Sequence, residues 1–356
     1  MNRTQVVLSR RLRRLTDAAV LLAIAFTLAS ASAVADHGAR DWPSEGPVPV
    51  SITVAARPLA AFRRGDPTEV TFGALRFRGG LLLTSPFKHF GGLSALRLDA
   101  DGTRFLSLSD KGHWFAGKLV YRNGQLAGVS NAVAAPMLGD DGRPITARGW
   151  YDSESLARVG ATVYVGLERV HRILKFDFDD GALAAPGRSI PVPPALRALP
   201  RNKGIEALVA VPEGQPLGGA LVAISERGLD ADGHIQGFLI GGPTPGQFAI
   251  RRTAYYDISD ATLLPDGGLL LLERKFSLRG GIGVRIRRLT LADLAPGAVV
   301  DGPTLFEADL GDEIDNFEGI DTHRTEDGET VITLVSDDNF SFLQRTLLLQ
   351  FTLLER

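Results

Sequence analysis

The sequence predicts an all-β protein built as a β-propeller, and three observations support this prediction. Short runs of apolar and β-branched residues recur along the chain, whereas long amphipathic helical stretches are hard to find. Asp-Gly pairs separate many of these runs. The runs also fall into units that repeat about every 55 residues. A period of that length with several strands per unit is typical of propeller blades, and a β-sandwich does not need one.

The predicted strands alternate with tight turns. Representative strands cover residues 94–98, 104–108, 161–167, 221–224, 268–272 and 330–335. The Asp-Gly pairs begin at Asp101, Asp141, Asp180, Asp232, Asp266 and Asp327. Because glycine accepts the positive φ of a two-residue hairpin turn, Asp-Gly between apolar runs is a strong hairpin signal. We therefore expect antiparallel sheets made of sequential hairpins.

Five repeat units are legible in the sequence. Their markers are Ser94, Glu154, Glu206, Asp260 and Glu318, at steps of 60, 52, 54 and 58 residues. Each unit turns and returns in a second run, which ends in an acidic residue followed by a basic or another acidic one. Residues 71–84, with a hairpin at Gly79-Gly80, and residues 347–354 could close the ring. They could equally form a sixth blade, so the sequence allows five or six blades.

The composition excludes several classes of protein. The 356 residues are 44% hydrophobic, which is more than a disordered chain contains. The absence of cysteine excludes disulfide-stabilised miniproteins, thiolate zinc sites and iron–sulfur clusters. A net charge of −2 lacks the basic surplus of most nucleic-acid binders, so no nucleic-acid partner is expected. Any metal must be held by oxygen or imidazole ligands.

Residues 1–35 are expected to be a secretory signal peptide. Four arginines between positions 10 and 14 precede an apolar run over residues 18–28, and small residues end at Ala33-Val34-Ala35. The run is short for a membrane span and no later segment qualifies, although an uncleaved anchor remains the alternative. We expect a periplasmic or secreted protein, with the general secretory and twin-arginine routes both open.

Cleavage would change the charge and define the remaining segments. The leader carries five arginines and one aspartate, so the mature chain would have a net charge of −6. Residues 36–64 are expected to be an N-terminal segment, and residues 65–356 the propeller domain. The mature chain is long enough to bury a core without disulfides or metal, and we expect a monomer.

The acidic residues that recur in the units form the candidate site. In a hairpin, the start of the first strand and the end of the returning strand lie at the same end of the sheet. The predicted pairs are Glu154 with Glu168, Glu206 with Glu226, Asp260 with Glu273, and Glu318 with Asp337. If these strands are innermost in their blades, the pairs converge around one mouth of the central channel.

This convergence predicts a site for a metal and an anionic substrate. The predicted catalytic residues are Glu154, Glu206, Glu226, Glu318 and Asp337. The predicted metal ligands are Glu154, Glu206, Asp260, Glu318 and Asp337, a set of oxygen donors suited to Ca²⁺. The predicted substrate-binding residues are Lys111, Arg169, Lys203, Arg227 and Arg274. The alternative is that strand-end charges form salt bridges between blades and have no catalytic role.

Several units resemble a known family in their motifs and in the order of those motifs. The motifs are Gly91-Gly92-Leu93-Ser94-Ala95-Leu96, Asp152-Ser153-Glu154-Ser155-Leu156, Asn202-Lys203-Gly204-Ile205-Glu206-Ala207-Leu208, Ile224-Ser225-Glu226-Arg227, Asn316-Phe317-Glu318-Gly319-Ile320 and Ser336-Asp337-Asp338-Asn339. They resemble the bacterial exported family called "esterase-like activity of phytase" over about residues 65–355. The resemblance implies a propeller related to the calcium-dependent alkaline phytases, which cleave phosphomonoesters.

The function predicted from these observations is hydrolysis of a small anionic ester at the central mouth of an exported propeller. The reaction is expected to be that of an esterase or phosphoesterase, with Ca²⁺ as the candidate cofactor. The sequence contains no G-x-S-x-G motif, H-E-x-x-H motif or P-loop, so those mechanisms are not supported. Two alternatives stay open: a non-catalytic periplasmic propeller that binds a ligand or a protein, and a propeller lactonase.

Overall fold

The computed structural model describes residues 48–178, 183–277 and 281–354. All of them belong to the compact unit Asp41–Arg356. The predicted signal peptide and the predicted turn at Asp180-Gly181 lie outside the described residues. Among the described residues, no helix has both the length and the apolar character needed to cross a membrane.

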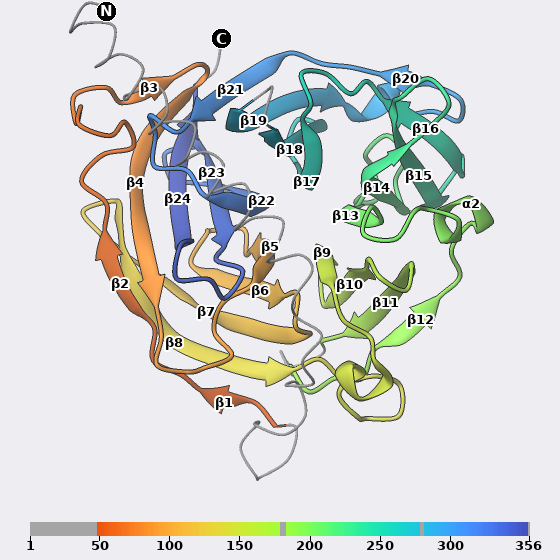
Figure 1. Ribbon diagram of the computed structural model, residues 1–356, viewed down its shortest axis with the longest axis horizontal. Coiled ribbons are helices and arrows are strands. Elements are labelled where there is room, and N and C mark those ends of the chain that lie inside the picture. The colour runs from red at the N-terminus through yellow and green to blue at the C-terminus, as the bar shows by residue number, and fades with distance from the viewer. Residues whose placement is uncertain (1–47, 179–182, 278–280, 355–356) are drawn as a thin grey trace, which may run out of the picture. The chain divides into compact units, whose positions relative to one another are not determined.

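The described residues form five antiparallel β-sheets arranged as the blades of a propeller (Figure 1). From the channel outward, blade I contains β5 (Leu93–Leu98), β6 (Arg104–Ser109), β7 (His113–Arg122) and β8 (Gln125–Pro136), with β1 (Val50–Ser51) at its outer edge. Blade II contains β9 (Ser153–Val159), β10 (Thr162–Leu167), β11 (Arg172–Asp177) and β12 (Arg188–Ile190), and the short helix α2 (Pro194–Arg197) follows it.

The other three blades continue the same order. Blade III contains β13 (Ile205–Ala210), β14 (Ala220–Leu229), β15 (Ile235–Gly241) and β16 (Gly246–Ile250), with β20 (Val299–Val300) added in parallel. Blade IV contains β17 (Asp257–Leu263), β18 (Gly268–Ser277), β19 (Gly281–Thr290) and β21 (Thr304–Asp309). Blade V contains β22 (Asn316–Arg324), β23 (Thr330–Asp337), β24 (Thr346–Leu353), β4 (Leu75–Thr84) and β2 (Ala55–Pro58), and β3 (Thr71–Phe72) also pairs with β4.

Apolar side chains between neighbouring blades hold the ring together. The buried apolar residues form five clusters, and each cluster fills one of the five interfaces between blades. At the interface of blades IV and V, the ring centroid of Phe62 lies 5.7 Å from that of Phe306 and 5.1 Å from that of Phe351. Sheets buried on both faces read as nearly continuous apolar runs, which explains the short apolar runs of the sequence.

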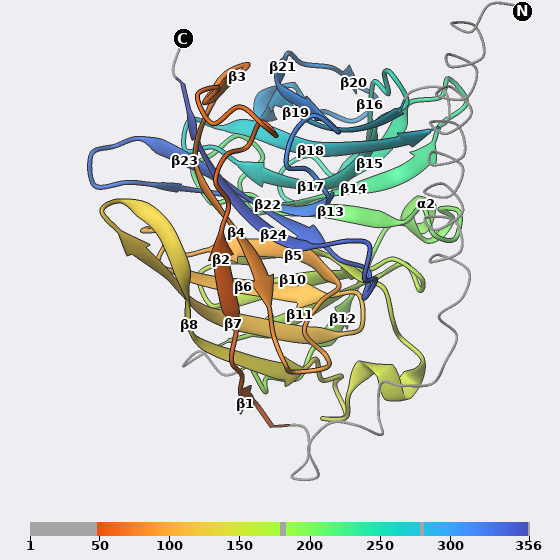
Figure 2. The same cartoon turned by 60° about the vertical axis from the view of Figure 1, so that its left-hand side comes forward.

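The ring is closed in blade V by pairing of β4 with β24, which Figures 1 and 2 both show side by side. This confirms the predicted closure by residues 71–84 and 347–354 and excludes the alternative of six blades. Gly79-Gly80 is not a hairpin turn, because both glycines lie inside β4. A Cβ atom on Gly80 would lie 2.5 Å from Leu349 Cδ2, so a larger residue there would force the buried Leu349 side chain of β24 to shift.

The innermost strand of every blade carries a β-bulge near its start. The residues left out of the pairing register are Ser94, Glu154, Glu206, Ser259 and Glu318. We call these five residues the bulge positions. Because a bulge redirects a side chain away from the regular alternation of the strand, five equivalent bulges point one side chain per blade in an equivalent direction.

Candidate metal-binding site

Each blade contributes a second residue at the end of the channel where the innermost strands begin, which we call the rim. In the returning chain, it comes directly after the residue that pairs with the strand position just before the bulge. These return positions are Asp110, Glu168, Glu226, Arg274 and Asp337. Seven of the ten bulge and return positions carry a carboxylate, and we call these seven the carboxylate cluster: Asp110, Glu154, Glu168, Glu206, Glu226, Glu318 and Asp337.

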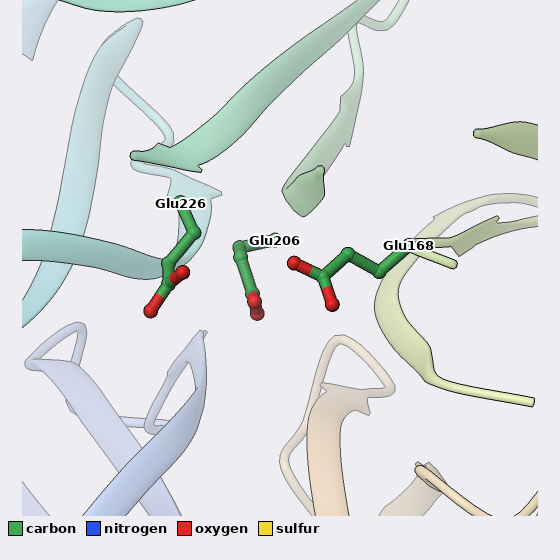
Figure 3. Close-up of side chains that lie close together, drawn as sticks. All are labelled: Glu168, Glu206 and Glu226. Carbon is green, nitrogen blue, oxygen red and sulfur yellow. The ribbon is translucent and has the colours of Figure 1, made fainter. Parts of the chain in front are cut away.

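Three of these carboxylates come closest to one another. Glu168, Glu206 and Glu226 each offer a carboxylate oxygen, and the three oxygens lie within 4.8 Å of one another. Figure 3 shows Glu206 between the other two, with the carboxyl group of Glu168 directed toward it. Glu168 follows β10 of blade II, whereas Glu206 and Glu226 come from β13 and β14 of blade III. The group therefore spans the interface between two blades.

Burial and repulsion between carboxylates raise the pKa of three carboxyl groups on blades II and III: Glu154, Glu168 and Glu206. Burial is the largest cause of the raised pKa of Glu154 and Glu206, and neighbouring carboxylates raise both further. The pKa of Glu168 rises to about 7 through burial and the charges of Glu226 and Asp152, although a hydrogen bond from the Gly204 amide opposes the shift. A set of buried like charges is unfavourable without a cation, because each carboxylate disfavours the ionised form of the next.

The same holds on the blade V side of the rim. Burial and the charges of Glu318 and Asp110 raise the pKa of Asp337 well above its ordinary value. Burial raises the pKa of Asp110 to about 6, although the ammonium group of Lys111 opposes the shift. Repulsion therefore extends around the channel from blade V through blade I to blade III.

The five predicted substrate-binding cations all lie at the rim, and each is paired with a carboxylate. Lys111 Nζ lies 2.5 Å from Asp110, and Lys203 Nζ lies 2.5 Å from Glu226. Arg274 binds Glu318 and donates to Asn316 Oδ1 at 2.6 Å. The remaining pairs are Arg169 with Asp152 at 3.9 Å and Arg227 with Asp257 at 3.1 Å.

The structure brings together five of the predicted acidic residues and leaves out Asp260. Glu154, Glu206, Glu226, Glu318 and Asp337 all occupy bulge or return positions. In blade IV the bulge is Ser259 and the return position is Arg274, so the predicted pair of Asp260 with Glu273 is one residue out of register. Along a strand, a shift of one residue turns a side chain to the other face, which is why both carboxylates miss the cluster.

Asp260 and Glu273 instead bind arginines inside the fold. Glu273 accepts hydrogen bonds from Arg285 and Arg287 within blade IV. Asp260 pairs with Arg97, whose Nη1 and Nη2 donate to the two carboxylate oxygens at 2.9 and 3.1 Å. The prediction that Asp260 is a metal ligand together with Glu154, Glu206, Glu318 and Asp337 is therefore wrong in its placement of Asp260.

Arg97 crosses the channel just past the bulges. Its guanidinium also donates to the carbonyl oxygens of Leu208, Ala261 and Ile320 at 3.0–3.1 Å. One side chain from blade I is thus bonded to the innermost strands of blades III, IV and V. These hydrogen bonds connect the innermost strands of four of the five blades across the channel. The only sequence signal was a lone arginine in the middle of an apolar run.

The interpretation of the sequence also left Asp110 and Glu168 out of the candidate ligands. Glu168 was paired with Glu154 by the hairpin argument, and Asp110 ends the returning run of the first unit. The signal that could have found both is their register, because each comes directly after the residue that pairs beside the bulge, as Glu226 and Asp337 do. When the bulge and return positions are counted in the same way in all five blades, Asp110 and Glu168 belong to the cluster and Asp260 does not.

The donor set fits a hard divalent cation. Every candidate ligand in the cluster is a carboxylate oxygen, and three carboxylates already lie within reach of a common point. Asp110 Oδ1 is buried and has no hydrogen-bond partner among the described residues. Seven carboxylates face three adjacent cations, Lys111, Lys203 and Arg274. The residues present therefore suit Ca²⁺ in both chemistry and charge.

The stability of the metal-free protein is expected to fall as pH rises from 5 to 8. The folded state holds the protons of Asp110 and Glu168 more tightly than the unfolded chain does, so this stabilisation is lost as pH rises through about 6 and about 7. We expect a loss on the order of 1–3 kcal/mol in the free energy of unfolding, measured by urea titration in the presence of a chelator. Glu168→Gln should flatten the profile. A stability that is constant or rises over this range would contradict the prediction.

The fold and the rim define the class of the protein: a five-bladed β-propeller with a carboxylate cluster at one end of its channel. Residues 88–340 match the family model Phytase-like, described as "Esterase-like activity of phytase". The chain belongs to this family. No curated protein matches it.

Among solved structures, the chain is similar to the crystal structure of the Cps50 (Swd1) β-propeller domain of Myceliophteria thermophila. The two are 12% identical, with a TM-score of 0.34. The similarity covers 69% of this chain and 65% of that one.

Proposed function

We propose that this protein is an exported, monomeric hydrolase that cleaves a small anionic ester, of the phosphoester class, at its rim with the assistance of Ca²⁺. The observation that carries the proposal is the group formed by the buried Glu168 and Glu206 and the half-buried Glu226, with carboxylate oxygens within 4.8 Å of one another. Membership of a family described by esterase-like activity of phytase supports the choice of reaction.

The candidate ligands for Ca²⁺ are Glu168, Glu206 and Glu226, with Glu154, Glu318 and Asp337 on the neighbouring blades. When bound there, Ca²⁺ would supply a Lewis acid that polarises an ester oxygen and makes water more acidic. Lys111, Lys203 and Arg274 border the cluster and are the donors that would orient the anionic group and stabilise developing negative charge.

Glu154 and Asp337 are the candidates for proton transfer. The pKa of each is raised well above its ordinary value by burial and by neighbouring carboxylates. A bound cation beside them would favour their ionised forms, and a carboxylate that does not coordinate the ion can accept a proton from water and pass it to a leaving oxygen. Their places on blades II and V put them on different sides of the rim.

A substrate panel tests the proposal. Turnover of p-nitrophenyl phosphate, phytate, p-nitrophenyl acetate and a γ-lactone would be measured with the mature chain, with added Ca²⁺ and with a chelator. We expect Ca²⁺-dependent release of phosphate, lost on chelation while the circular dichroism spectrum of the fold is retained. Turnover of the lactone alone would assign the rim to a lactonase. No turnover of any substrate would exclude hydrolysis for these classes.

One observation weighs against an anionic substrate and so bears on the rival function, a non-catalytic propeller that binds another kind of ligand or a protein. All five rim cations are already paired with carboxylates, so an anionic ligand has to compete with existing ion pairs. A binding module predicts neither turnover nor a requirement for metal.

Export is proposed from the arginine-rich leader, and N-terminal sequencing of the periplasmic and secreted fractions would test for cleavage after Ala35.

A further inference from the structure

The exposed aromatic side chains are concentrated at the rim. Among the described residues the exposed aromatic side chains are Tyr255, Phe276, Phe340 and Phe342. Tyr255 precedes β17, Phe276 lies near the rim end of β18, and the two others follow β23. All four therefore belong to the rim ends of the adjacent blades IV and V. The opposite end of the propeller has no exposed aromatic residue among those described.

The loop from Asp338 to Arg345, which we call the Phe340 loop, presents the largest part of this apolar surface. Phe342 is 96% exposed, and Leu343 beside it is 55% exposed. Phe340 is also exposed, and its ring lies 5.7 Å from Lys111 Nζ. Exposed apolar residues occur singly on most proteins, whereas adjacent ones beside a polar site mark a ligand-binding surface.

The loop is fixed in this conformation by hydrogen bonds to the rim. Asn339 and Phe340 both have positive φ, 48° and 50°, a conformation that asparagine adopts readily and that is costly for phenylalanine. The amide of Asn339 donates to Asp337 Oδ1 at 2.6 Å, and the amide of Phe340 donates to Asp338 Oδ1 at 3.0 Å. The apolar side chains are thus displayed by a constrained turn that begins at a member of the carboxylate cluster.

The Phe340 loop is also continuous with the cluster on the blade I side. The amide of Gly92 donates to Asp338 Oδ1 at 3.1 Å. A Cβ atom on Gly92 would lie 2.3 Å from Asp110 Oδ1 and 2.6 Å from Phe340 Cε2. The carboxylate of Asp110 and the ring of Phe340 therefore meet over the same glycine. A ligand held over the cluster has the apolar loop at its edge.

We propose that the Phe340 loop is an apolar subsite and that the ligand is amphiphilic, with an anionic ester group over the cluster and an alkyl chain against Phe340, Phe342 and Leu343. This inference rests on the proposed function for the anionic half of the ligand. The constrained loop binds the apolar half, and burial of its methylene groups against the aromatic rings supplies affinity that the polar cluster does not.

The test is the dependence of binding on chain length. Ethyl-, butyl- and hexylphosphonate would be titrated calorimetrically into the wild-type protein with Ca²⁺ present. We expect the dissociation constant to fall at least about tenfold from ethyl to hexyl, and less than about threefold in Phe342→Ser. Val159→Ser, which changes an exposed apolar residue at the far end of β9, should keep the wild-type dependence.

The outcomes separate this inference from the proposed function. If the dissociation constants of the phosphonates depend on chain length but neither ethyl nor hexyl phosphate is hydrolysed, the result contradicts the proposed hydrolysis and supports the subsite. Equal turnover of both phosphates, with no chain-length dependence of binding, would keep the hydrolase and overturn the subsite. Absence of phosphonate binding would also overturn the subsite. Dimerisation on sedimentation that Phe342→Ser abolishes, with no chain-length dependence, would assign the loop to self-association.

Discussion

Arg97→Ala is expected to lower the free energy of unfolding by about 3–5 kcal/mol. The guanidinium is buried, pairs with the fully buried Asp260, and donates to the carbonyl oxygens of Leu208, Ala261 and Ile320. Its removal leaves a buried carboxylate uncompensated and these carbonyl groups without that donor. Because the bonds reach three other blades, the loss weakens contacts across the channel. Urea denaturation monitored by circular dichroism measures the effect.

A matched control lies in the same hairpin. Arg104 of β6 is also an arginine in an ion pair, with Nε 3.0 Å from Asp99 Oδ2, but its side chain is 71% exposed. Arg104→Ala should cost less than about 1 kcal/mol, because exposed ion pairs contribute little. Equal effects of the two substitutions would show that Arg97 does not hold the blades together. Arg97→Met combined with Asp260→Leu should recover part of the stability, because no unpaired charge remains.

Glu206→Gln is expected to reduce Ca²⁺-dependent turnover at least about 100-fold. Glu206 is buried between Glu168 and Glu226 and shares their oxygen cluster, so the amide removes the central anionic donor at nearly constant volume. The same change relieves repulsion, so the metal-free variant should be at least as stable as the wild type. Calcium should then raise the melting temperature of the wild type and not that of the variant.

The matched control is Glu326→Gln, the same chemical change in the exposed β22–β23 turn at the opposite end of the propeller. It should leave both turnover and the thermal shift at wild-type values. If Glu206→Gln retains wild-type turnover in Ca²⁺, the group of three glutamates is not where the reaction is assisted. A loss of stability in the metal-free variant would instead give Glu206 a structural role.

Sequence periodicity was sufficient to predict the propeller and much of the rim. The units repeat because each blade needs an innermost strand and a returning strand, and the residues Glu154, Glu206 and Glu318 mark the same bulge in three blades. The number of blades could not be obtained in this way. It depends on whether β4 pairs with β24 or forms a blade of its own, and that is a contact between distant segments.

The error in blade IV has a local cause. Ser259-Asp260 offers two candidate markers, and only the pairing of Ile258 with Glu273 shows that Ser259 is the bulge. Asp260 is acidic like the glutamates at the bulges of other blades. The position of a residue in the strand pairing, and not its chemical type, decides which face of the strand its side chain occupies. The link between Arg97 and Asp260 was invisible for another reason. It joins side chains of opposite blades, and no periodic pattern relates them.

The pairing of β4 with β24 has a consequence for the order of folding. Blade V draws its outer strands from near residue 80 and its inner strands from near the end of the described chain, so it cannot be completed until residues 346–353 have been synthesised. Closing so long a loop costs chain entropy before its contacts form, and such topologies fold slowly. Until then the edge of β4 that later pairs with β24 has no native partner. A chain still being translated would therefore carry an open ring, with blades I to IV able to form before the fifth.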